Sequence, residues 1–363
     1  MKPGLISVII FCAIFAFGCI TLGQDEQVAG TNQSNTTTNQ TNDSANMSAN
    51  DSQPPVQKNT TTVLPVINKS VNETPSQPQF GMKYNITSNQ YLDIYFIDVG
   101  QLVPETKQGE AILLKRGDLE ILVNGGPNGS SDRLLSFLKS KNVDDIDLLI
   151  STSSDPKNSE VFSNISKEFT IEEFWYSGQD NGNVQYGERV QKIKDKGVYY
   201  GVVGSGYNIT ANDIRLTVLN PQDKSFGNPH DDSLVIRIDF GRNFSMLLTS
   251  SIHEKAQQEL LKKNKKMLNC SIMQAPYYGL LSATENISAF LDVAVPQTVI
   301  ITGTVDDSKK EGGSRLKFKE QLVERGIAYF ETYNGGTVIV RTDGFETWLS
   351  QTGTPAVNSA DTE

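Results

Sequence analysis

Few side chains in this sequence could hold a metal ion or act as a general base near neutral pH. Only two histidines occur among the 363 residues, His230 and His253. His230 is followed by Asp231 and Asp232 in a proline-containing loop. Imidazole and carboxylate groups are zinc ligands, so these three residues, together with Asp155, could form a weak metal site. The alternative interpretation is a solvated turn that caps the start of a strand.

A serine nucleophile is a second chemical possibility. Ser153 or Ser251 could be activated by His253 acting as general base. No feature of the sequence orients either serine toward that imidazole, so we expect no catalytic residue here. His253 opens a helical pattern over residues 253–264, and we expect it to be a surface residue or a helix cap.

Apolar runs bounded by turn residues predict the strands that would position these groups. The expected strands are residues 92–99, 111–114, 120–123, 148–150, 214–219, 234–240, 244–249, 271–275 and 298–301. Helical periodicity lies between them, around residues 134–138, 190–193, 256–261, 287–291 and 316–323. This alternation predicts an α/β (α+β) domain in which helices cover the outer faces of mixed sheets. A two-sheet αββα sandwich fits the pattern, and a plainer α/β domain is the alternative.

Several motifs occur in a fixed order along this domain. Residues 96–101 read FIDVGQ, residues 109–114 read GEAILL and residues 121–127 read ILVNGGP. This order resembles the opening of metallo-β-lactamase-fold hydrolases of the ComEC-like branch, the hydrolase-like C-terminal domain of a competence protein. Later matches at residues 145–152, 232–237, 246–249 and 275–279 extend the resemblance over about residues 91–350, with an insertion at residues 102–108. The resemblance implies an αββα sandwich.

Members of that family bind two divalent metals, commonly zinc, through a motif HxHxDH and later residues, and activate a water molecule. In this chain the matching stretch, residues 153–158, reads SSDPKN. The positions matched to the family's ligands are Ser153, Asp155, Lys157, Asn158, Ser251, Tyr277 and Tyr278. A lysine beside the site also disfavours dications. The resemblance therefore implies a degenerate site that holds no metal, and zinc would be the cofactor only if a new site used Asp155, His230, Asp231 and Asp232.

The N-terminus has the composition of an export signal. Lys2 precedes an apolar run over residues 5–17, and Gly18 and Cys19 follow it. The run is shorter than the roughly 20 apolar residues that span a bilayer. Residues 1–23 therefore predict a signal that resembles a lipoprotein box, with cleavage before Cys19 and lipidation of its thiol. Because Phe17 is bulky for that box, an uncleaved helical anchor is the alternative.

Residues 24–79 are dominated by Asn, Thr, Ser, Gln and Pro and offer almost nothing to a core, so we expect a disordered stalk. Nine asparagines in it begin Asn-x-Ser/Thr sequons: Asn32, Asn35, Asn39, Asn42, Asn46, Asn50, Asn59, Asn68 and Asn72. A glycosylated, acidic, anchored stalk resembles archaeal surface proteins. The folded domain is expected at residues 80–353, with a disordered tail at residues 354–363.

The charge balance argues against nucleic acid as a partner. The 42 acidic and 32 basic residues give a net charge of −10, and no strong basic cluster occurs. Of the three cysteines, only Cys270 lies outside the signal, so no disulfide is expected within the mature domain.

Three functions are consistent with these features. The first is a pseudoenzyme displayed outside the cell, anchored to the membrane, with a ligand-binding or scaffold role and an unknown ligand or protein partner. The second is a surface hydrolase with a rebuilt metal site. The third is a structural component of the envelope.

Overall fold

The computed structural model describes residues 91–99, 109–211, 213–222, 224–303 and 314–353. Several predicted segments lie outside the described residues: the export signal with Cys19, the stalk with its nine sequons, residues 80–90, the insertion at residues 102–108 and the tail. No helix among the described residues is long and apolar enough to cross a membrane.

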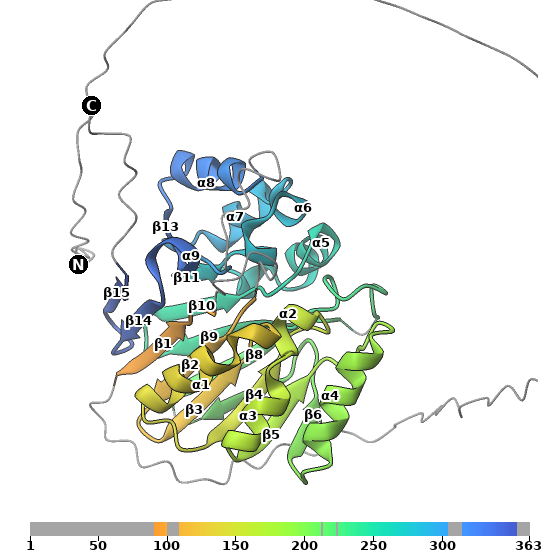
Figure 1. Ribbon diagram of the computed structural model, residues 1–363. Helices are drawn as coiled ribbons and strands as arrows, with labels where there is room; N and C mark the ends of the chain where they lie inside the picture. The colour runs from red at the N-terminus through yellow and green to blue at the C-terminus, as the bar shows by residue number, and fades with distance from the viewer. Residues whose placement is uncertain (1–90, 100–108, 212, 223, 304–313, 354–363) are drawn as a thin grey trace, which may run out of the picture. The chain divides into compact units, whose positions relative to one another are not determined.

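The first sheet has strand order β15-β14-β1-β2-β3-β4-β5-β6 (Figure 1). Its strands are β1 (Leu92–Phe96), β2 (Ile112–Arg116), β3 (Leu119–Val123), β4 (Ile146–Ser151), β5 (Ile171–Tyr176), β6 (Tyr199–Val202), β14 (Val338–Thr342) and β15 (Thr347–Gln351). Strands β3 to β6 run parallel, so their carboxyl ends lie at one edge of the sheet.

The second sheet has strand order β13-β12-β11-β10-β9-β8-β7. Its strands are β7 (Asn208–Ala211), β8 (Ile214–Asn220), β9 (Val235–Phe240), β10 (Phe244–Leu248), β11 (Ile272–Gln274), β12 (Thr298–Ile301) and β13 (Ala328–Glu331). Strands β10 to β13 are parallel, which again places their carboxyl ends together.

The two sheets pack face to face. One apolar cluster contains inward-facing residues of both, such as Ile112 and Ile150 from the first sheet and Ile236 and Met246 from the second. Successive strand residues point to opposite faces, so Leu113 and Leu149 enter a different cluster under the helices. Burial on both faces explains why these strands read as continuous apolar runs in the sequence.

Helices cover the outer face of each sheet (Figure 1). Residues of α1 (Ser131–Ser140), α3 (Phe162–Glu168) and α4 (Val184–Lys194) pack on the first sheet. Residues of α5 (Glu254–Lys263), α7 (Ser288–Ala294) and α8 (Ser314–Glu324) pack on the second. The shorter elements are α2 (Pro156–Ser159), α6 (Leu281–Thr284), α9 (Thr332–Gly335) and the 3-10 turns η1 (Asn128–Ser130), η2 (Lys265–Met267) and η3 (Pro276–Gly279).

This layering confirms the predicted αββα sandwich. The nine strands predicted from the sequence correspond to β1–β4 and β8–β12. Cys270 is buried with a free thiol.

Candidate pocket at the carboxyl ends of the strands

Loops from both sheets meet where the parallel strands end. Leu234, before β9, donates its backbone N–H to the carbonyl of Thr152, after β4, at 2.7 Å. The hydroxyls of Thr152 and Ser250 lie 2.6 Å apart, which joins the loops after β4 and β10. Ligands of open α/β sheets bind beyond the carboxyl ends of strands, so this edge is the natural place for a site.

A buried carboxyl group lies at the centre of this junction. Glu110 is only 2% exposed. Its oxygens accept hydrogen bonds from the side chains of Asn124 (2.7 Å), Thr302 (3.3 Å) and Gln274, which come from three other strand ends. Burial raises the pKa of Glu110 from 4.5 to about 7, although these hydrogen bonds oppose the rise. Sequence reasoning missed this network, because Glu110 appeared there only as part of a family motif.

A hydrogen-bonded chain occupies several positions that the family resemblance assigns to metal ligands. Asn158 Nδ2 donates to Ser153 Oγ at 3.0 Å, and the Tyr278 hydroxyl donates to Asn158 Oδ1 at 2.9 Å. All three side chains are buried. Burial raises the pKa of Tyr278 well above its ordinary value, so this phenol stays protonated and acts as a donor. Ser251 is buried within reach of the same phenol.

Both histidines belong to one aromatic stack. The rings of His230 and His253 lie parallel, with centroids 4.5 Å apart, and each lies 4.7 Å from the ring of Tyr277. His230 Nδ1 and His253 Nε2 are buried and have no hydrogen-bond partner among the residues that the structure describes. Burial lowers the pKa of both imidazoles, and each is expected to be neutral at pH 7.

The prediction for His253 is confirmed for its position at the start of α5 and wrong for its side chain. It occupies the N-cap position of α5, but its side chain makes no capping hydrogen bond and is half-buried in the stack. The cap comes instead from Asp231, whose Oδ1 accepts from the backbone N–H groups of His253 (3.1 Å) and Ala256 (3.0 Å). Nothing in the local sequence of α5 indicates this distant cap.

Two of the three aspartates of the predicted weak metal site, Asp231 and Asp232, accept hydrogen bonds from backbone N–H groups. Asp231 caps α5, and its other oxygen accepts from Asn228 Nδ2 at 3.0 Å. Asp232 accepts from the N–H groups of Phe226 (2.6 Å) and Gly227 (3.2 Å) and from the Ser225 hydroxyl. Of the four residues proposed for that site, the structure places only Asp155 and His230 at a common cavity.

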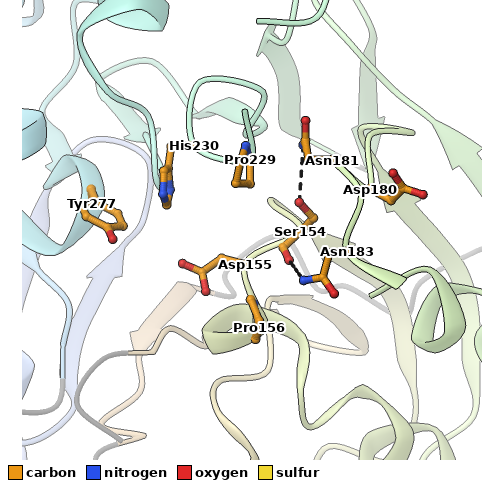
Figure 2. A pocket seen from close by; sticks show the side chains of 9 residues that line it. All are labelled: Ser154, Asp155, Pro156, Asp180, Asn181, Asn183, Pro229, His230 and Tyr277. Atoms are coloured by element: carbon orange, nitrogen blue, oxygen red, sulfur yellow. Dashed lines mark hydrogen bonds between the residues drawn. The ribbon is translucent and has the colours of Figure 1, made fainter. Parts of the chain in front are cut away.

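That cavity has a volume of about 290 Å³ (Figure 2). Its lining residues are Ser154, Asp155, Pro156, Asp180, Asn181, Asn183, Pro229, His230 and Tyr277. Asp155 is 7% exposed, and one of its oxygens accepts from the backbone N–H of Lys157 at 3.0 Å. In Figure 2 its carboxylate points toward the side of the pocket where His230 and Tyr277 lie.

The remaining predicted positions lie around this cavity without lining it. Ser153, Lys157, Asn158, Ser251 and Tyr278 are absent from its lining. No hydrogen bond within the described residues joins Ser153 or Ser251 to His253, so the structure shows no serine–histidine pair. The lining residues that sequence reasoning missed, Asp180, Asn181 and Asn183, come from the loop between β5 and α4.

The residues at the family's ligand positions do not fit a pair of divalent metals. Zinc sites use histidine, cysteine and carboxylate ligands. Here a serine and an asparagine hydrogen-bond to each other, and the phenol of Tyr278 completes the chain. Asp155 alone offers a carboxylate, so no metal-dependent step is derived for this site.

One acidic group elsewhere brings together side chains of metal-binding type. Oxygens of Glu120, Asp144 and Asp145 lie within 4.8 Å of one another. These residues precede or begin β3 and β4, at the end of the strands opposite the pocket. Lys115 forms an ion pair with Glu120, which supplies this group with a positive charge.

No family model and no curated protein matches this sequence. Solved structures do show similarity. The metallo-β-lactamase fold protein YhfI from Bacillus subtilis is 12% identical, with 66% of this chain and 95% of that chain covered and a TM-score of 0.45. Igni18, a metallo hydrolase from Ignicoccus hospitalis, is 13% identical, with 69% and 98% covered and a TM-score of 0.43.

The metallo-β-lactamase GOB-18 from Elizabethkingia meningoseptica is 13% identical, with 59% of this chain and 87% of that chain covered and a TM-score of 0.37. At such identities and TM-scores, the similarity transfers neither activity nor metal content to this chain.

Proposed function

We propose that this protein is a non-catalytic binding protein with a degenerate site, related to the ComEC-like branch of the metallo-β-lactamase superfamily. The observation that carries the proposal is the buried chain Ser153–Asn158–Tyr278. Its hydrogen bonds satisfy polar atoms where the family resemblance expects metal ligands. A buried hydrogen-bonded network is costly to disrupt, so metal entry would have to break these bonds without gaining imidazole ligands.

The adjacent cavity supports a binding role. It is concave, lies beside the strand ends and combines two carboxylates, two amides and two aromatic rings. Sites for small molecules commonly combine a few such polar groups with apolar or aromatic walls. We propose that the domain is displayed outside the cell on a glycosylated stalk, anchored through the N-terminal segment, so that this pocket faces the exterior.

Hydrolysis assays test this function directly. The purified full chain, supplied with Zn²⁺ or Mn²⁺, is expected to show no turnover of phosphodiester, thioester or β-lactam substrates above the buffer rate. Metal-dependent turnover that is lost on chelation would overturn the proposal.

A hydrolase with a rebuilt metal site is the second candidate, and one observation favours it. His230 Nδ1 and His253 Nε2 are buried without hydrogen-bond partners. Two nitrogens alone fall short of the ligands that a catalytic zinc ion requires. If this candidate holds, His230→Ala will abolish both metal binding and turnover. Under the first proposal, neither is present to be lost.

A further inference from the structure

The pocket has an excess of negative charge. Asp155 and Asp180 line it, whereas none of the nine lining residues is lysine or arginine. Within the described residues, no ion pair joins either carboxylate to a cation. A carboxylate as buried as that of Asp155 is stabilised by a positively charged partner. A cationic ligand could reach it through the cavity.

Each of the two lining amides already donates one hydrogen bond within the protein. Asn183 donates to the carbonyl of Ser154 at 2.9 Å and accepts from the N–H of Tyr186 at 3.0 Å. Asn181 Nδ2 donates to Ser154 Oγ at 3.5 Å, and both contacts to Ser154 are drawn in Figure 2. The charged groups that the lining offers to a ligand are the carboxylates of the buried Asp155 and the exposed Asp180.

An aromatic wall faces the same space. Tyr277 and His230 line the pocket, and the angle between their ring planes is 62°. His253 stacks on His230 and does not line the pocket. Aromatic faces attract organic cations and also cover their alkyl carbons. The lining contains no lysine or arginine that would attract an inorganic anion.

We propose that the pocket binds a small alkylammonium ion, with its N–H groups on Asp155 and Asp180 and its carbon chain against Tyr277 and His230. This inference rests on the proposed binding function and names the ligand class of the same site. The positive charge of Lys157 lies close enough to His230 to contribute to the lowering of its pKa. Because Lys157 lies outside the lining, it opposes a cationic ligand without blocking it.

Calorimetric titration of the full chain with three four-carbon probes tests the charge requirement. Putrescine is expected to bind at one site per chain. The neutral 1,4-butanediol should bind at least tenfold more weakly, and the anion succinate should not bind. Comparable binding of butanediol or succinate, or no binding of putrescine, would overturn the inference while leaving the proposed binding function in place. Metal-dependent hydrolysis would instead refute the proposed function itself.

Two variants with opposite expected signs separate recognition from folding. Asp155→Asn keeps an oxygen for the N–H of Lys157 and should weaken putrescine binding at least tenfold. Lys157→Met should strengthen it several-fold. Asp118→Asn, an exposed residue in the turn between β2 and β3, is the control and should leave the affinity unchanged. If Asp155→Asn and Asp118→Asn weaken putrescine binding equally, the ligand is attracted only by the overall negative charge of the protein, and the proposed site is wrong.

Discussion

The carboxyl group of Glu110 is placed among strand ends of both sheets, and its titration should be visible in the stability of the whole domain. Its pKa is raised by burial from 4.5 to about 7. Between these values the folded protein keeps a proton that the unfolded chain has released, so stability falls as pH rises through this window and then levels. Asp147, whose pKa burial also raises to about 7, acts in the same direction.

We therefore expect these two carboxyl groups to contribute more to the free energy of unfolding in urea at pH 5 than at pH 7.5. The two histidines act in the opposite direction, because burial lowers the pKa of each. The contribution of Glu110 is at most a few kcal/mol, since one pKa unit corresponds to about 1.4 kcal/mol. Glu110→Gln should reduce the difference between the two pH values. An unchanged difference in Glu110→Gln would show that this carboxyl does not titrate in the window.

A second residue-scale prediction concerns Asp231, which is 4% exposed and caps α5 from a distant loop. Asp231→Ala should lower the free energy of unfolding by about 1–2 kcal/mol, because two helix N–H groups lose their acceptor. The exposed Asp132 in the first turn of α1 is the control, and Asp132→Ala should cost only a few tenths of a kcal/mol. Equal losses in the two variants would argue against the cap.

At the scale of elements, the turn between β14 and β15 approaches the turn between β9 and β10. The carbonyl of Gly344 accepts from the N–H groups of Arg242 (3.0 Å) and Asn243 (2.9 Å). A Cβ on Gly344 would lie 2.8 Å from the Cα of Gly241, and its φ is +89°. Gly344 thus links one turn of each sheet at a point with no space for a side chain.

Gly206 provides a matched comparison, because its φ is +94° and a Cβ there would meet nothing within 4 Å. Gly206→Ala should cost about 1–2 kcal/mol in urea unfolding from backbone strain alone. Gly344→Ala should lower the free energy of unfolding by more, because the added Cβ would also clash with the backbone of Gly241. If the two substitutions cost the same, the contact between the turns is not tightly packed.

The sequence predicts those strands that are buried on both faces. Strands β1–β4 and β8–β12 appear as apolar runs because helices or the other sheet cover each side. Strand β5 was missed because Glu172 and Glu173 interrupt its pattern, although Glu173 is buried beside Trp175. Strand β6 was missed because it is a sheet edge with exposed Tyr199, Tyr200 and Val202.

The site was predictable only in part, for a physical reason. The resemblance assigned Asp155 and Tyr277 to ligand positions, and the structure brings both to one cavity, because strand ends fix where their loops begin. The stack of His230 on His253 depends on contacts between segments more than 20 residues apart. The directions of the Asn181 and Asn183 side chains are likewise set by hydrogen bonds to Ser154, which the local sequence does not reveal.

At the scale of the whole molecule, we propose that the N-terminal segment anchors the domain to the membrane. If Cys19 is lipidated, mass spectrometry of the membrane-bound protein from an exporting host should show a mature N-terminus at Cys19 that carries added lipid mass. Cys19→Ser should lack that mass. A wild-type protein that still begins at Met1 would instead indicate the uncleaved helical anchor.

We propose that the positions matched to the family's metal ligands hold no metal, and elemental analysis tests this proposal most directly. The full chain would be loaded with zinc and manganese, passed through gel filtration and compared with His230→Ala/His253→Ala and Asp144→Asn/Asp145→Asn variants. The second variant accounts for any ion held by the acidic group near Glu120. We predict that the wild-type chain and the histidine variant differ by well below one bound ion per chain. One or two ions lost in the histidine variant would contradict the account and establish a rebuilt metal site.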